Sequence, residues 1–181
     1  MKIDVTRIVV AQIRTMKDNS TQKYSVPDLT LFYGLPVLLG AAGSYYGWKF
    51  NADVLNALLA AFSIFAGLLL NLLILVYTFS SQAEHPAALE QNRMALIKEL
   101  HDNTAYSILV SIVLVVVTMI TVAYLKMHEK PPETAFTGRW VSGAVIFLTT
   151  NFVLTLLMIL KRIYIMLNQT INKPFISKRI A

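Results

Sequence analysis

Four long runs without a charged residue stand out along the sequence, at 29–48, 54–77, 105–125 and 140–160. Each is close to the length of about 20 apolar residues with which a helix crosses the hydrocarbon core of a bilayer. A helix in a soluble core rarely stays uncharged for this long, so we interpret the four runs as transmembrane spans. The pattern predicts an all-α polytopic membrane protein with four transmembrane helices and cytoplasmic helical extensions.

Amphipathic stretches flank these spans. Residues 1–25 place Val5, Ile8 and Ile13 on one helical face, which is typical of a helix that lies in the membrane interface or covers its own bundle. The segments 86–104 and 161–170 are predicted to extend the third and fourth spans into the cytoplasm. No proline or glycine interrupts 87–125, which allows one helix of roughly 58 Å. All of these parts fit a single domain, residues 1–181.

Uncharged polar and small residues recur at helical spacing within the spans. In 54–77 they fall on one face at steps of three and four residues, and shorter series follow in the third and fourth spans. The positions that we single out are Asn56, Ser63, Gly67, Asn71, Ser111, Thr118, Thr150 and Asn151. Such side chains either hydrogen-bond between the helices of one bundle or line a pore between copies of the chain. The sequence leaves both interpretations open.

The first span carries a proline and a series of small residues. Pro36 removes a backbone hydrogen bond and predicts a kink. Small residues at a spacing of three or four let another backbone approach closely, and here they are Gly40, Gly43, Ser44 and Gly47. The connection 49–53 is short, so the first and second spans are predicted to be antiparallel neighbours.

Composition agrees with a membrane protein and adds an orientation. The chain is 56% hydrophobic and 14% charged, against about 25% charged residues in soluble domains. With four spans, twelve of the 16 Lys and Arg residues fall on the side of the two termini and the middle loop. The positive-inside rule then predicts that both termini are cytoplasmic. This bias accounts for the basic charge, so we expect no direct binding of nucleic acid.

Residues for catalysis or ion coupling are missing from the predicted spans. None of the four contains Asp, Glu, Lys, Arg or His, the groups that proton-coupled transporters and voltage sensors need at membrane depth. The chain has no cysteine, and its histidines are His85, His101 and His128, of which the last falls on the opposite side of the membrane. A zinc site needs three or four ligands that converge. We therefore expect no enzyme activity, no metal and no cofactor.

The pair His101 and Asp102 is the one arrangement that resembles part of an active site. The two residues are neighbours on a predicted helix, where consecutive side chains point apart. We expect them to lie on a solvated polar face together with Glu99.

The second and third spans carry a resemblance to a known group of proteins. The segment SIFAGLLLNLLILVYTFSS, followed by a charged helical stretch and LIKELHDNTAYSILVSIVLVVV, resembles the small four-span membrane proteins of bacterial anti-phage defence systems, such as the membrane subunit of the Kiwa system. The likeness lies in the order of the helical segments and in their general residue composition. It implies location in the bacterial inner membrane and assembly into a homo-oligomer that senses membrane perturbation, partners a cytosolic effector or permeabilises the membrane. It contains no motif that assigns a role to an individual residue.

The cytoplasmic extensions carry apolar and basic residues that need a partner. We expect them to dock a cytosolic protein through Arg7, Arg14, Arg93, Met94, Ile97 and Leu100. The function predicted first is a non-enzymatic sensor or scaffold subunit that contacts membrane lipid, assembles into a homo-oligomer and docks a cytosolic partner in antiviral defence. The alternative is a pore-forming effector or channel, in which the polar stripes line the pathway.

Overall fold

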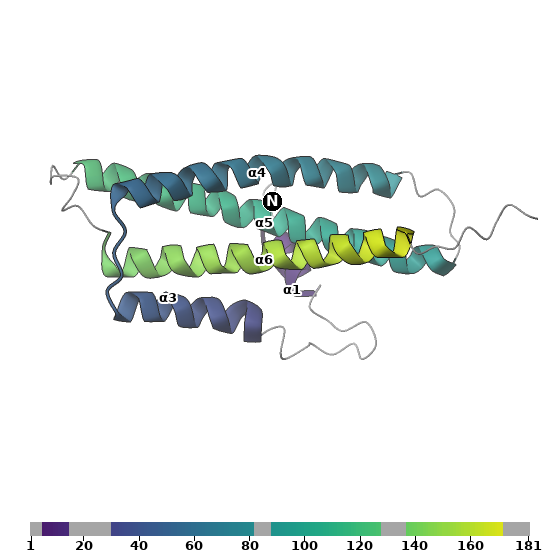
Figure 1. Ribbon diagram of the computed structural model, residues 1–181, viewed down its shortest axis with the longest axis horizontal. Coiled ribbons are helices and arrows are strands. Elements are labelled where there is room, and N and C mark those ends of the chain that lie inside the picture. Colours follow the sequence, from purple (N-terminus) through teal and green to yellow (C-terminus); the bar gives the residue numbers. More distant parts are fainter. Residues whose placement is uncertain (1–4, 15–29, 82–87, 128–136, 172–181) are drawn as a thin grey trace, which may run out of the picture.

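The computed structural model describes residues 5–14, 30–81, 88–127 and 137–171. Their elements, in chain order, are α1 (Val5–Arg14), the π-helical segment η1 (Thr30–Gly34), α3 (Leu35–Tyr45), α4 (Ala52–Ser81), α5 (Ala88–Met127) and α6 (Arg139–Ile171). The described residues contain no strand. Figure 1 shows α3, α4, α5 and α6 running along one long axis. The predicted all-α fold is confirmed.

Three of the helices are long and apolar enough to cross a membrane. The qualifying stretches are Ala52–Thr78, Met94–Met127 and Arg139–Asn168. They contain the predicted spans 54–77, 105–125 and 140–160. The described chain therefore holds three candidate spans, where the sequence pattern predicted four.

The first predicted span is shorter than expected. Its described helical part, η1 followed by α3, covers 16 residues, or roughly 24 Å at 1.5 Å per residue, against about 30 Å of hydrocarbon. Gly47 ends it with a backbone φ of 67°, a left-handed conformation that glycine adopts freely. The Trp48 N–H then donates to the Gly43 carbonyl at 3.0 Å, which is the hydrogen bond of a Schellman cap. The helix therefore stops before the end of the charge-free run.

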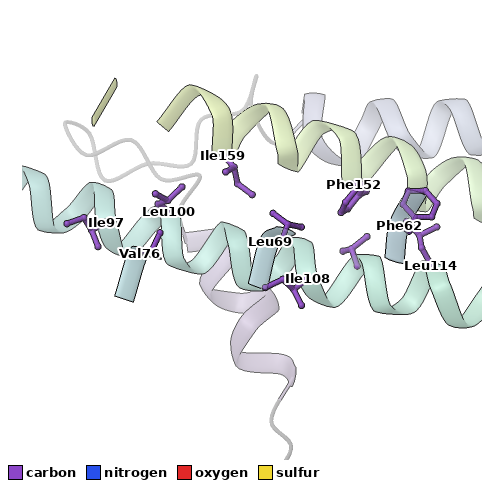
Figure 2. Packing of buried hydrophobic residues seen from close by; sticks show 10 residues of the cluster. Phe62, Leu69, Val76, Ile97, Leu100, Ile108, Leu114, Phe152 and Ile159 are labelled. Atoms are coloured by element: carbon purple, nitrogen blue, oxygen red, sulfur yellow. The ribbon is translucent and has the colours of Figure 1, made fainter. Parts of the chain in front are cut away.

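One face of α4 builds the core against α5 and α6. Its buried positions recur every seven residues, at Leu55, Phe62, Leu69 and Val76, the spacing of a helix packed along its length against a partner. Figure 2 shows Phe62 and Phe152 meeting across α4 and α6, with ring centroids 5.4 Å apart at nearly a right angle. This edge-to-face geometry is favourable for aromatic pairs.

The extensions predicted for the third and fourth spans are present as parts of single helices. Helix α5 runs unbroken for 40 residues and α6 for 33, about 60 Å and 50 Å at 1.5 Å per residue. Helix α1 contacts α5 and crosses it in Figure 2. Its Ile8 and Ile13 are half-buried and Gln12 is buried, while Arg7 is exposed. The remainder of the predicted helix 1–25 lies outside the described residues.

Candidate functional site

The polar series of α5 faces the interior of the bundle. Ser107, Ser111 and Thr118 are completely buried. The Ser111 hydroxyl donates to the Ile108 carbonyl at 2.7 Å, and the Thr118 hydroxyl donates to the Leu114 carbonyl at 2.7 Å. The hydroxyls of Ser111 and Thr118 are therefore satisfied within their own helix, and both side chains lie inside the bundle of a single chain.

The polar series of α4 has the opposite placement. We call it the outer stripe; its members are Asn56, Ala60, Ser63, Gly67, Asn71 and Thr78, all exposed. It lies across the helix from the buried seven-residue series, because the two sets are about 150° apart at 100° per residue. The Ser63 hydroxyl donates to the Leu59 carbonyl at 2.8 Å. The six positions of the outer stripe therefore lie on the side of α4 that faces away from the bundle formed by the described residues.

Asn151 on α6 joins three elements. Its Oδ1 accepts a hydrogen bond from the Tyr106 hydroxyl of α5 at 3.0 Å, and its Nδ2 donates to the Phe32 carbonyl of η1 at 3.4 Å. In a regular α-helix Phe32 would bond to the N–H of residue 36, which a proline lacks. The π-helical segment and Asn151 thus accommodate the group that Pro36 leaves without a partner. Thr150, the neighbouring predicted position, is half-buried.

Asn151→Leu is expected to lower the free energy of unfolding by about 1–2 kcal/mol, because it removes both hydrogen bonds and leaves the Tyr106 hydroxyl and the Phe32 carbonyl unsatisfied in an apolar interior. Thermal unfolding in detergent, followed by circular dichroism, measures the change. Thr150→Val, one position away, is the control and should cost less. Equal stability of Asn151→Leu and the wild type would contradict this role.

The small residues of the first predicted span form a close contact between α3 and α6. A β-carbon on Gly40 would lie 2.9 Å from the Gly143 carbonyl oxygen, and one on Gly43 would collide with Ile146 Cδ1. The Ser44 hydroxyl donates to the Arg139 carbonyl at 3.3 Å. Gly47 differs, since a β-carbon there would meet nothing within 4 Å. Gly47 caps the helix and makes no close helix contact.

Hydrogen bonds tie three helix ends together at this end of the bundle. The Arg139 guanidinium donates to the carbonyls of Ser44 and Tyr45, the last residues of α3. Phe50 and Thr137 bond reciprocally: the Phe50 N–H donates to Thr137 Oγ1 at 3.0 Å, and the Thr137 N–H donates to the Phe50 carbonyl at 3.1 Å. The sequence pattern marked Ser44 as a small residue but indicated none of these hydrogen bonds, because only the fold brings positions about 90 apart into contact.

Two of the predicted docking residues are buried in the core of the chain. Ile97 is 5% exposed and Leu100 is 2% exposed, and Figure 2 shows both among the core residues of α4, α5 and α6. Leu100 is covered by the chain itself, so the prediction that it docks another protein is wrong. Ile97 is also a core residue, and only the small exposed part of its side chain lines the surface described next. Met94 and Arg7 are exposed. The side chains of Arg93 and Arg14 lie outside the described part of the structure.

A groove lies beside these buried residues, between the end of α4 and the beginning of α5. It has a volume of about 520 Å³ and is lined by Val76, Tyr77, Met94, Ala95, Ile97, Lys98 and His101. Tyr77, Met94, Lys98 and His101 are exposed. The lining is mostly apolar. Lys98 contributes a positive charge, and His101 contributes an imidazole whose Nδ1 lies 3.2 Å from Asp102 Oδ1. This surface fits an apolar side chain with an acidic neighbour.

An ion pair fixes the helices next to the groove. The Arg162 guanidinium on α6 donates to Glu99 Oε2 on α5, with side chains only 11% and 25% exposed. Removing either side chain of such a poorly exposed pair destabilises the protein, because the other charge would remain without compensation. This ion pair therefore links the first half of α5 to the last third of α6.

His101 and Asp102 meet, contrary to the expectation that they point apart. His101 Nδ1 lies 3.2 Å from Asp102 Oδ1 at an exposed position. Glu99, the third member of the predicted polar face, is engaged by Arg162 instead. Among the described residues, no group of three or more His, Asp or Glu side chains is arranged to hold a metal ion. His85 and His128 lie outside these residues.

Comparison with protein-family models, with curated proteins and with solved structures finds no match to this chain. Over its described residues the chain belongs to the class of all-helical proteins, with three helices long and apolar enough to cross a membrane.

Proposed function

We propose that this chain is a non-enzymatic subunit of a bacterial inner membrane, which assembles with copies of itself and docks a cytosolic protein. The groove between α4 and α5 is the observation that carries the proposal. It combines an apolar lining with Lys98 and His101 on a part of the molecule that an ion pair holds in place. A cytosolic partner with an apolar side chain beside acidic residues complements this surface.

Exposed aromatic residues support the placement in a membrane. Tyr45, Tyr46, Trp48 and Trp140 are exposed near the ends of α3 and α6 that the hydrogen bonds tie together, and Tyr77 and Tyr164 are exposed toward the other end of the bundle. Tyrosine and tryptophan concentrate at the two membrane interfaces. We place the hydrocarbon between these two belts, with η1 and α3 as a fourth embedded segment.

The orientation follows from the same placement. With the fourth segment embedded, the basic residues concentrate at the end that holds the groove, which favours a cytoplasmic location for that end and for both termini. Helix α5, at about 60 Å, is about twice as long as the hydrocarbon is thick. The surplus forms the projection that carries Met94 and Lys98. The resemblance to four-span defence proteins favours antiviral defence as the setting.

The double variant Met94→Glu, Lys98→Glu is expected to weaken docking about tenfold or more, which corresponds to about 1.4 kcal/mol. It places acidic groups in an apolar and basic groove, where they repel an acidic partner. Affinity purification with the product of the adjacent gene, followed by titration, measures the loss.

The matched control is Met127→Glu, Lys126→Glu, which makes the same two changes at the other end of α5, where both side chains are exposed. Partner binding by this control should equal that of the wild type. If the variant in the groove binds as tightly as the control, docking at this groove is refuted.

One observation favours a pore as the second candidate. The outer stripe presents Asn56, Ser63 and Asn71 away from the bundle, and several copies with this face turned inward would surround a polar pathway. Leakage of a dye from liposomes that contain the purified protein tests this function. Liposomes that remain tight in the presence of the partner would exclude it.

A further inference from the structure

We infer that the outer stripe of α4 is the contact between two parallel copies of the chain, centred on Gly67 and Asn71. The inference rests on the self-assembly proposed above and adds the surface that carries it. The stripe lies on the face of α4 opposite Leu55, Phe62, Leu69 and Val76, which fill the chain's own core. Nothing in the described chain covers it.

Asn71 is a polar side chain in an apolar environment. Its carboxamide belongs to a candidate membrane span and lies among exposed apolar side chains, with Leu68 58% exposed on one side and Ile74 64% exposed on the other. No hydrogen bond joins it to another described residue. Hydrocarbon offers neither a donor nor an acceptor, so a polar group there is costly until another protein group satisfies it.

The space around Gly67 is open. A β-carbon at this position would meet nothing within 4 Å, so glycine is not required for packing within the chain. Ser63, Gly67 and Asn71 follow at steps of four residues along the exposed face. Small residues at this spacing let two membrane helices approach until their backbones touch. Gly67 therefore provides the close approach that Asn71 needs to reach a partner.

A second copy is the partner that matches this surface. All copies insert in the same direction, so a two-fold axis along the membrane normal places Asn71 opposite Asn71. A carboxamide is self-complementary, because each Oδ1 accepts from the Nδ2 of the other. A helix crossing centred on Gly67 also lets the bulkier Ile74 diverge from its counterpart, as in right-handed crossings of membrane helices.

Disulfide formation in native membranes tests the contact. The chain has no cysteine, so each introduced thiol is unique. Ser63→Cys on the outer stripe is expected to yield a covalent dimer on mild oxidation. Met119→Cys, which places a thiol at a 63% exposed position of α5, is expected to yield none. Absence of a dimer from Ser63→Cys, or equal yields from the two variants, would overturn the inference.

Asn71→Leu tests the hydrogen bond within the contact. This change is expected to raise the dissociation constant of the dimer about tenfold, measured by native mass spectrometry of the full chain in detergent. The helicity and melting temperature of the monomer should stay unchanged, because Asn71 makes no bond within the described chain. An unchanged dissociation constant would refute the role of Asn71.

The access of water to position 71 distinguishes a packed contact between two copies from a water-filled pore. In the packed contact, Asn71→Cys in the assembled protein resists a charged, water-soluble thiol reagent. Rapid labelling would show a water-filled pathway and overturn the inference. The partner-binding titration with Met94→Glu, Lys98→Glu is independent of these results, so a monomer that still docks its partner would refute the contact and leave docking intact.

Discussion

Gly143→Leu is expected to separate α3 from α6 and to lower the free energy of unfolding by about 3 kcal/mol. A β-carbon at position 143 would lie 2.8 Å from the Gly40 carbonyl oxygen and 3.2 Å from Ser44 Cβ. A backbone oxygen cannot rotate away as a long side chain can, so the two helices have to move apart. Thermal unfolding in detergent measures the loss, and limited proteolysis shows whether α3 becomes accessible.

Gly67→Leu is the matched control, since it changes a second glycine in a membrane helix to the same residue. A β-carbon there meets nothing within 4 Å, and leucine favours a helix more than glycine does. At a dilution where the chain is monomeric, so that loss of the contact proposed at Gly67 does not contribute, this variant should therefore unfold at the same temperature as the wild type or slightly above it. A melting temperature of Gly143→Leu equal to that of this control would show that the small residues do not hold α3 against α6.

Arg162→Met is expected to lower the free energy of unfolding by about 3 kcal/mol, because it leaves the Glu99 carboxylate without a counter-charge at a poorly exposed position. The double variant Glu99→Leu, Arg162→Met should recover much of this loss, since an apolar pair of similar volume has no charge to desolvate. The coupling energy from the double-mutant cycle, about 1–3 kcal/mol, is the quantity to measure.

Lys161→Met is the control for Arg162→Met. It removes a positive charge one residue earlier on α6, at an exposed position, and should change stability by about 0.5 kcal/mol or less. A double variant whose loss equals the sum of the two single losses would show that Glu99 and Arg162 do not stabilise each other.

The long helices could be predicted because their signal is local. Absence of charge over about 20 residues marks a membrane helix, and absence of proline and glycine marks its continuation, as in α5. The extent of the first span was harder to predict. Its charge-free run extends to Trp48, but the left-handed Gly47 stops the helix first, and hydropathy does not register a cap.

The sequence could not predict whether each polar series faces the interior of the bundle or its outer surface. Ser111 on α5 is buried and Ser63 on α4 is exposed, although both are serines in an apolar helix. The lipid and the interior of the helix bundle are both apolar. The division into apolar and polar positions that separates the core from the surface of a water-soluble protein is therefore weak in a membrane protein. Ile97, near the beginning of α5, shows the same difficulty. Its apolar face has to be covered, and only the fold shows that side chains of the same chain cover it.

The two ends of the bundle are both fastened, and this has a mechanical consequence. At one end the Arg139 guanidinium donates to the end of α3, and the Thr137 N–H donates to the Phe50 carbonyl just before α4. At the other end Arg162 on α6 holds Glu99 on α5. Helix α5 is about 60 Å long, so a tilt of the whole bundle by about 5° displaces one end of this helix sideways relative to the other by about 5 Å.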